Sequence, residues 1–176
     1  TSGIDIYEDY VLLHNLQFIH TSSGVGGDGA IVITTVTSLN NKIVCDSCII
    51  KGVCSGTGWG YGINIGTNGV VDVYNCVIYG FLSGSDTGFR GITQGSGTTV
   101  RVFNSTIFGN YYGLYKPSAP QLTVKNCAVF NNTDDFFGLS ITIDYCASDD
   151  GDGTNAENFT AEATDWNAVF TDYTVG

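Results

Sequence analysis

An internal repeat constrains the fold of this chain more than any other feature. Its ten-residue frame reads apolar, any, apolar, any, Asn, small, any, apolar, aromatic, Gly or Asn, and it occurs at residues 71–80, 100–109 and 122–131. Looser copies lie at residues 11–19, 44–50 and 141–148, with Asn15, Asp46 and Tyr145 in the Asn position. The spacing between Asn positions falls from 31 to 19 residues along the chain. A repeat of this size indicates a solenoid, a propeller or another array.

The repeating unit is predicted to be strand, turn, strand. Each copy holds two short runs of alternating apolar residues, and Met is absent from the chain, so the pattern favours strands over helices. A second recurring element, an aromatic residue or Arg followed by Gly and an aliphatic residue, occurs at 61–63, 90–92, 112–114 and 137–139. We therefore expect about three strands per turn. Asn suits a sharp corner because it tolerates the left-handed conformation, and stacked amides can form a hydrogen-bonded ladder.

At this level the coils resemble the pectin-lyase-like right-handed parallel β-helix family, which carries the same V-x-V-x-N-[CNS]-x-I-x-[GN] frame. The resemblance covers roughly residues 4–148. It implies an all-β, right-handed, single-stranded parallel β-helix of about six coils. The competing fold, a β-propeller, has blades of about 40–45 residues, which the shorter spacings contradict. The resemblance leaves function open, because this fold hosts lyases, hydrolases, epimerases, tailspikes, adhesins and surface-layer proteins.

Domain organisation and charge narrow the range of partners. We expect residues 1–148 to form the coils, and residues 149–176 to form an acidic loop and a partial cap that leads into further polypeptide. The net charge of −11 leaves no basic patch for phosphate backbones, which argues against nucleic-acid binding. No apolar run is long enough for a membrane span, so no membrane insertion is expected.

The cysteines divide into two sets. Just after the Asn position, where a small inward side chain fits, the repeat places Ser47, Cys76, Ser105, Cys127 and Cys146. These cysteines are expected to be reduced and buried. Cys45, Cys48 and Cys54 form the other set, for which free thiols, a local disulfide and a metal site are the alternatives. Alternation along the strand would point Cys45 and Cys48 to different sides of a turn.

Few residues suggest catalysis. In the family that the chain resembles, lyases use an Arg or Lys base beside calcium-binding acids, and hydrolases use grouped carboxylates. The best candidates here are Asp72 and Arg101, which the repeat places on neighbouring coils and which also fit a surface ion pair. Asp134 and Asp135 form a loop pair without the motifs of the family's hydrolases. The sequence therefore favours a protein without catalytic activity.

The acidic segment 149–157 is the candidate metal site. Its sequence, DDGDGTNAE, resembles carboxylate-rich loops that wrap Ca²⁺, although it lacks the full spacing of an EF-hand. The predicted ligands are Asp149, Asp150 and Asp152. A flexible acidic turn without a metal is the alternative.

Aromatic residues predict a contact surface. Tyr79, Phe108 and Phe130 share one repeat position, with Ile19 and Ile50 in the earlier coils, and Tyr74 and Phe103 form a shorter second column. An exposed apolar stripe usually marks an interface. Packing under loops, contact between subunits and a platform for sugar rings are the three alternatives for this stripe. In the Gly-rich loops, the predicted ligand contacts are Trp59, Tyr61, Phe89 and Arg90.

The function that fits these features best is a non-catalytic structural or adhesive β-helix of an extracellular assembly. Examples are a phage virion decoration or tail protein and a bacterial surface protein, so the expected location is extracellular, on a cell surface or on a virion. Expected partners are further copies in a homotrimer, other subunits of the assembly, or a glycan. The alternative is a carbohydrate-active β-helix, a polysaccharide lyase or hydrolase, or a fragment of one.

Overall fold

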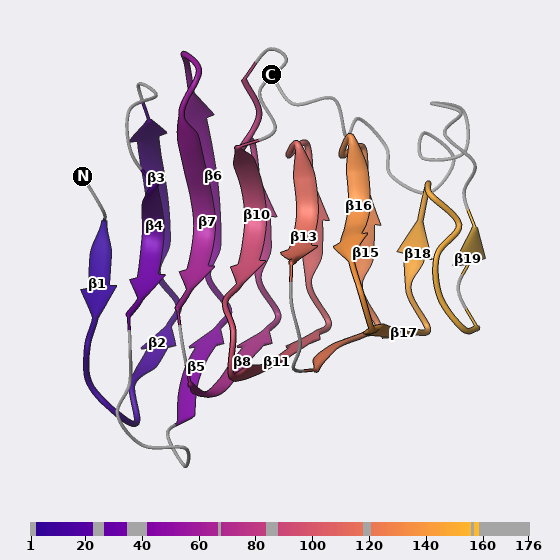
Figure 1. Ribbon diagram of the computed structural model, residues 1–176, viewed down its shortest axis with the longest axis horizontal. Helices are drawn as coiled ribbons and strands as arrows, with labels where there is room; N and C mark the ends of the chain where they lie inside the picture. Colours follow the sequence, from indigo (N-terminus) through magenta and orange to yellow (C-terminus); the bar gives the residue numbers. More distant parts are fainter. Residues whose placement is uncertain are drawn as a thin grey trace.

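The computed structural model describes residues 3–22, 27–34, 42–66, 68–83, 88–117, 121–155 and 157–158. Within these ranges the chain forms no helix, and its strands build three parallel sheets that we name A, B and C. The strands of sheet A run down the front of Figure 1, and the chain returns behind them as it moves to the right, so the coil is right-handed. Sheets A and B each contain six strands, which confirms a parallel β-helix of about six coils.

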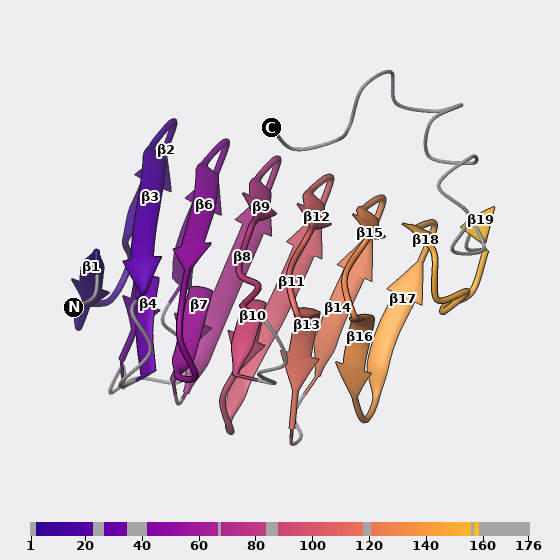
Figure 2. The same ribbon diagram turned by 90° about the horizontal axis from the view of Figure 1, so that it is seen from above.

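The three sheets are the walls of a prism, and the coils follow one another in a row along its long axis (Figure 2). Sheet A contains β1 (Ile4–Ile6), β4 (Gly27–Ile33), β7 (Trp59–Ile65), β10 (Phe89–Gln94), β13 (Tyr112–Lys116) and β16 (Asp134–Gly138). Sheet B contains β2 (Leu12–His14), β5 (Lys42–Asp46), β8 (Gly69–Tyr74), β11 (Thr98–Phe103), β14 (Leu122–Lys125) and β17 (Ile141–Asp144). Sheet C contains β3 (Gln17–Ser22), β6 (Ile49–Cys54), β9 (Val77–Tyr79), β12 (Thr106–Phe108), β15 (Ala128–Phe130), β18 (Ala147–Ser148) and β19 (Glu157–Asn158).

The core consists of columns of similar side chains that run along the axis. On sheet A, Ile63, Ile92 and Leu114 pair in register and are buried. On sheet B, Val100 pairs with Leu122 in the same way. Neighbouring strands lie about 4.8 Å apart, so each branched side chain packs on its equivalent in the next coil. The apolar positions of the repeat therefore form one continuous core. Among the described residues no helix is long and apolar enough to cross a membrane.

The corner between sheets B and C carries the Asn positions of the repeat. Six residues with positive φ mark it: Asn15, Ser47, Asn75, Asn104, Asn126 and Tyr145. This confirms the predicted corner, with one correction in the second coil. Asp46 pairs with Tyr74 on the strand, so Ser47 and not Asp46 is the corner residue. The predicted corner is one residue too early, because in this coil Ser47 takes the left-handed conformation that Asn takes in the neighbouring coils.

The side chains at this corner do not form the expected amide ladder. Asn75 instead donates from Nδ2 to Oδ1 of Asp46, at 2.9 Å. No hydrogen bond joins the amides of Asn75, Asn104 and Asn126 in the part of the chain that the structure describes. Asn is suited to this corner mainly by its backbone conformation.

A column of thiols and one hydroxyl follows this corner, directed into the core: Cys48, Cys76, Ser105, Cys127 and Cys146. Each side chain donates to the carbonyl two residues earlier, as in the 3.1 Å contact from Cys76 Sγ to Tyr74 O and the 2.9 Å contact from Ser105 Oγ to Phe103 O. The column takes Cys or Ser because the side chain must be small and must carry a donor for that carbonyl.

The structure confirms the prediction of free thiols, because all six cysteines are unpaired. It corrects two other expectations. Cys48, not Ser47, belongs to the column, and Cys45 and Cys48 are both completely buried rather than on different sides of the turn. The left-handed residue between them redirects the chain, so the alternation of inward and outward positions starts again after the corner.

An amide ladder does exist, but at the corner between sheets C and A. There Gly80, Gly109 and Asn131 have positive φ. Asn132 Oδ1 accepts hydrogen bonds from the backbone N and the Nδ2 of Asn110, at 2.9 and 3.0 Å. Asn110 is completely buried and Asn132 is half-buried. Unpaired amides would be costly there, so the ladder links successive coils at this corner.

Glycines on sheet A allow neighbouring coils to approach closely. A Cβ on Gly62, Gly91 or Gly113 would lie 2.5 to 2.7 Å from a carbonyl oxygen of the following coil. The fourth member of this column is Asp135, because Leu114 pairs with Phe136. The predicted fourth copy at 137–139 is therefore wrong, since the aromatic-Gly-aliphatic pattern recurs there three residues out of register.

Candidate functional site

The outer face of sheet A carries the largest group of interacting aromatic side chains in the described chain. Tyr61, Arg90 and Tyr112 follow one another in register in one outward column, and Tyr115 and Phe137 pair in the next. The Arg90 Cζ atom lies 3.6 Å from the ring centroid of Tyr115 and 5.5 Å from that of Tyr61. We call these five residues the sheet A platform.

The rings of the platform are not all parallel. Tyr115 and Phe137 stack with centroids 5.1 Å apart and planes 4° apart, whereas Tyr112 is tilted by 40° from Phe137 and by 44° from Tyr115. Phe137 is 39% exposed and lies on β16, the last strand of sheet A. The face of Phe137 that points away from Tyr115 is therefore not covered by another described strand of this sheet. The platform offers ring faces, and not only ring edges, to a ligand.

Polar groups lie among these rings. Burial raises the pKa of the Tyr61 phenol and of the Tyr112 phenol above the ordinary range, so both stay neutral hydrogen-bond donors at physiological pH. Arg90 Nε and Thr93 Oγ1 are buried and have no hydrogen-bond partner among the described residues. The platform thus combines apolar ring faces, phenol hydroxyls and a guanidinium group on one surface.

The four predicted ligand contacts differ in how exposed they are. Tyr61 and Arg90 belong to the platform, but the Tyr61 side chain is only 5% exposed. Trp59, at the start of β7, is 55% exposed. Phe89 is completely buried in the core, so it cannot contact a ligand at the surface. Its side chain turns inward because it precedes the outward Arg90 on the same strand.

Sequence reasoning missed Tyr112, Tyr115 and Phe137 as platform residues. A signal was present: the aromatic-Gly-aliphatic element places Tyr112 at the position of Arg90 in the previous coil. The next outward position of that strand is occupied by Tyr115, opposite Thr93. The coils shorten toward this end of the chain, so the match was less evident from spacing.

On sheet C the predicted aromatic column is confirmed. The rings of Tyr79 and Phe108 lie 5.0 Å apart with planes 2° apart, and those of Phe108 and Phe130 lie 5.4 Å apart with planes 5° apart. Lys51 and not Ile50 precedes Tyr79 in the register, because Ile50 points into the core. Phe130 is only 2% exposed. Since these ring faces cover one another, the column presents mainly edges and does not provide a sugar platform.

The shorter column on sheet B is confirmed as well. The rings of Tyr74 and Phe103 lie 5.5 Å apart with planes 22° apart. The next coils continue this column with charged residues, and Lys125 Nζ lies 3.0 Å from Asp144 Oδ2. The outward face of sheet B is therefore a mixed ladder of rings and ion pairs.

Asp72 and Arg101, the candidate catalytic residues, form a two-point ion pair across neighbouring coils. The Arg101 Nε and Nη2 atoms lie 2.6 and 2.8 Å from the two carboxylate oxygens, and Lys42 Nζ lies 3.2 Å from one of them. Burial by itself raises the pKa of Asp72, but the hydrogen bonds from Arg101 and Lys42 outweigh burial and lower it below the ordinary range. The carboxylate is ionised with both oxygens occupied, so the pair is suited to holding coils together and not to proton transfer.

Replacing Arg101 by Met is expected to lower the free energy of unfolding by about 2 kcal/mol at pH 7, because the buried carboxylate of Asp72 then keeps one cation instead of two. Urea denaturation measures the change. The pKa of Asp72 is depressed in the folded state, so its stabilisation is present above the unfolded pKa and is lost as the pH falls. The deficit of the variant should therefore shrink below about pH 4.

Lys125→Met is the matched control, since it breaks the partly exposed pair with Asp144. We expect this control to cost less than about 1 kcal/mol. Equal losses in the two variants would contradict a special role for the buried pair.

An acid cluster lies at the C-terminal end of the described coils. Carboxylate oxygens of Asp135, Asp149 and Asp150 all lie within 4.8 Å of one another. Asp135 is completely buried, and its oxygens accept hydrogen bonds from Asn132 Nδ2 at 2.8 Å and from Ser148 Oγ at 2.7 Å. Burial, followed by the contact with Asp149, raises the pKa of Asp135 to about 8. Asp135 thus ends both the glycine column and the amide ladder.

The predicted calcium ligands are partly brought together. Asp149 and Asp150 join Asp135, while the predicted ligand Asp152 is exposed and lies outside the cluster. Asp149 Oδ1 is buried without a hydrogen-bond partner among the described residues. Three carboxylates could hold a calcium ion, and a proton shared between Asp135 and Asp149 would satisfy the same oxygens, so calcium binding stays a prediction. The partial cap predicted within residues 149–176 would be formed by residues 166–173, which lie outside the described residues.

Comparison of this chain with protein-family models, with curated proteins and with solved structures finds no match. The parallel β-helix therefore rests on the repeat and on the three sheets, and any function must be argued from the surfaces described above.

Proposed function

We propose that this chain is a non-catalytic adhesive β-helix of an extracellular assembly and that it binds a glycan through the sheet A platform. The observation that carries the proposal is the group of tilted, partly exposed rings beside Arg90, formed by Tyr112, Tyr115 and Phe137. A pyranose ring packs its C–H face on an aromatic face, and its hydroxyls need the donors that Arg90 and the tyrosine phenols provide. The net charge of −11 disfavours polyanionic saccharides, so the ligand is a neutral glycan.

The resemblance of the coils to the pectin-lyase-like family supports this proposal, because proteins of that family act on or bind polysaccharides. Such a module would occur in a phage virion decoration or tail protein or in a bacterial surface protein. The ion pairs that Asp72 forms with Arg101 and Lys42 occupy its carboxylate, which supports a role without catalysis.

One observation favours the alternative, a carbohydrate-active enzyme. Asp134 follows Tyr112 in the outward column of sheet A. Burial, and then the charge of Asp150, raises the pKa of Asp134 above the ordinary range. A carboxyl group with a raised pKa beside a sugar site is the property expected of a general acid.

A glycan array with the unmodified protein tests the proposal, followed by calorimetric titration of the best ligand. We expect Tyr112→Leu to weaken binding about tenfold, since it removes a ring face from the platform. Tyr74→Leu, on sheet B, should leave the affinity unchanged. Absence of any glycan ligand, or equal binding by both variants, would refute the platform.

Two further measurements separate the remaining parts of the proposal. Release of reducing ends from the bound polysaccharide, abolished by Asp134→Asn, would establish the enzyme instead of the adhesin. Light scattering on the native protein tests assembly: a trimer supports the proposed homotrimer, and a monomer at all concentrations excludes it.

A further inference from the structure

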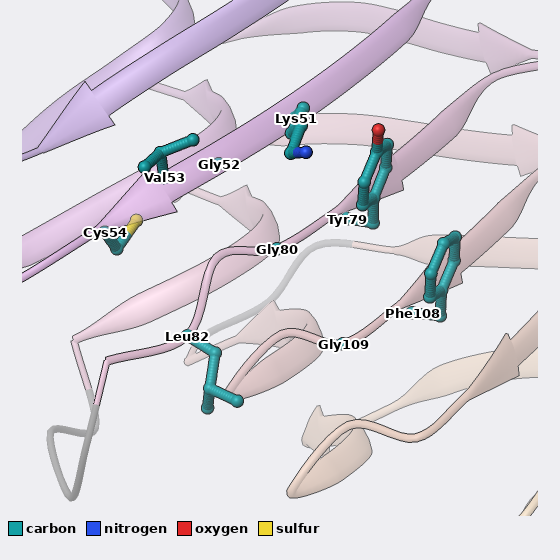
Figure 3. Close-up of a pocket in the computed structure, with 9 residues that line it drawn as sticks. All are labelled: Lys51, Gly52, Val53, Cys54, Tyr79, Gly80, Leu82, Phe108 and Gly109. Atoms are coloured by element: carbon teal, nitrogen blue, oxygen red, sulfur yellow. The ribbon is translucent and has the colours of Figure 1, made fainter. Parts of the chain in front are cut away.

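A groove lies on the outer face of sheet C, away from the platform. It encloses about 490 Å³, within the range of about 300–1,000 Å³ that is usual for small-molecule sites. We call it the sheet C groove, and it is lined by Lys51, Gly52, Val53, Cys54, Tyr79, Gly80, Leu82, Phe108 and Gly109 (Figure 3).

The floor of the groove is backbone, and its walls are mostly apolar. Gly52, Gly80 and Gly109 form the floor, where a Cβ on Gly52 would lie 2.8 Å from the Gly80 carbonyl oxygen. Figure 3 shows the rings of Tyr79 and Phe108 beside the glycines. A Cβ on Gly52 or Gly80 would collide with the backbone of the neighbouring coil, whereas a Cβ on Gly109 would meet only the Gly80 nitrogen, 3.9 Å away. Glycine at these positions leaves the floor without side chains.

The aromatic column ends in this groove. Tyr79 is the first ring of the column, and its neighbour in the preceding coil is Lys51. The ammonium of Lys51 lies 5.7 Å from the Tyr79 ring centroid, and Figure 3 shows the two side chains next to each other. One face of Tyr79 is therefore covered by a flexible chain where the later coils have a ring.

Lys51 also differs from the other described lysines in its partners. Lys42 and Lys125 pair with carboxylates, and Lys116 is buried against the carbonyls of Leu139 and Ser140. Lys51 forms no ion pair with any carboxylate in the described ranges. In a chain with a net charge of −11, an unpaired cation at the edge of an apolar groove is a specific complement for an anion.

We propose that the sheet C groove binds a small aromatic carboxylate. The Lys51 side chain moves off the Tyr79 ring to pair with the carboxylate, and the ligand ring takes its place on the ring of Tyr79. The ring continues the aromatic column by one coil. A sugar acid fits less well, because Val53, Leu82 and Phe108 offer no hydrogen bonds to hydroxyl groups. This site is separate from the platform and does not depend on the proposed function.

Titration of the native protein with 2-naphthoate, followed by its fluorescence and by calorimetry, tests the site. We expect saturable binding at a single site. Lys51→Met, which keeps the length of the side chain and removes its charge, should weaken binding about fivefold, the effect of one partly exposed ion pair. Tyr79→Leu should weaken binding further, because it removes the stacking face.

Lys125→Met is the matched control and should bind 2-naphthoate like the native protein, since Lys125 lies on sheet B. The neutral amide 2-naphthamide should bind about as weakly to the native protein as the carboxylate binds to Lys51→Met. Absence of binding would overturn the proposal. So would equal binding of the amide, which would indicate an apolar patch, or tighter binding of glucuronate, which would indicate a saccharide site. Circular dichroism of each variant confirms that lost binding is not lost folding.

Discussion

Replacing Gly91 by Ala is expected to lower the free energy of unfolding by about 3 kcal/mol, at the upper end of the usual cost of overpacking. A Cβ at this position would lie 2.6 Å from the carbonyl oxygen of Gly113, and it would also crowd Ile107 and Asn110. The carbonyl belongs to the next coil and cannot move without disturbing the ladder between β10 and β13. Urea denaturation followed by circular dichroism measures the loss.

Gly109→Ala is the matched control for this prediction. Gly109 has a φ of 63°, and an added Cβ would have one neighbour within 4 Å, the Gly80 nitrogen at 3.9 Å. The cost there comes from the left-handed conformation alone, about 1 kcal/mol, and Asn131 accepts the equivalent conformation. If both variants lost the same stability, close approach of the coils would not be the reason for the glycine column.

The second large effect is a fall in stability as the pH rises, caused by Asp135. The folded state raises the pKa of this buried carboxyl to about 8, whereas the unfolded chain loses the proton near pH 4. Between these values the folded state binds the extra proton, so the stabilisation is complete below about pH 4 and is lost as the pH rises to about 8. The contact with Asp149 adds to the effect of burial in this shift. We expect a contribution of about 5 kcal/mol over this window, from about 1.4 kcal/mol for each of roughly four pH units.

Comparison with Asp135→Asn isolates this contribution, because the other groups titrate alike in both proteins. The difference in unfolding free energy between native protein and variant should favour the native protein at pH 5 and should shrink or reverse by pH 9. Asp144→Asn serves as control, since the pKa of Asp144 is lowered by its hydrogen bonds to Asn155 and Lys125. The difference in unfolding free energy between Asp144→Asn and the native protein should not change between pH 5 and pH 9.

The same melts with added calcium chloride test the predicted metal. A bound cation takes the place of the proton, so calcium should raise the melting temperature of the native protein above pH 8 and leave Asp135→Asn unaffected. Equal shifts in both proteins would place the effect outside the acid cluster. If the difference in unfolding free energy between the native protein and Asp135→Asn did not change with pH, Asp135 would be ionised in the folded state with no loss of stability, and the prediction would be wrong.

The fold could be predicted from the repeat because the repeat carries the physical requirements of a coil. Alternating Val and Ile residues define an inward face, and Asn75, Asn104 and Asn126 stand where the backbone must turn through positive φ. In-register stacking of equivalent positions then follows, and it places Asp72 beside Arg101 and Tyr79 beside Phe108. These pairings were read from the sequence and are confirmed.

The candidate sites could be predicted only in part, because each left-handed corner restarts the alternation and the coils differ in length. That is why Ser47 replaced Asp46 at the corner and why Lys51, not Ile50, precedes Tyr79. Likewise, Phe89 was predicted to contact a ligand at the surface, but its side chain lies in the core. Sequence distance does not fix the register where a coil gains or loses a residue.

The repeat was sufficient to predict the architecture: a right-handed stack of three-stranded coils with an apolar core, left-handed corners and reduced cysteines. The tertiary structure alone decided which outward residues meet and what their surroundings do to them. In the folded chain the rings of Tyr112 and Phe137 are tilted against each other, and Lys51 forms no ion pair with a carboxylate of the described residues. The fold also encloses Asp135 among acids, raising its pKa. The physical reason is that a repeat specifies contacts within its own period, whereas burial, ring tilt and charge pairing depend on the particular side chains that neighbouring coils bring together.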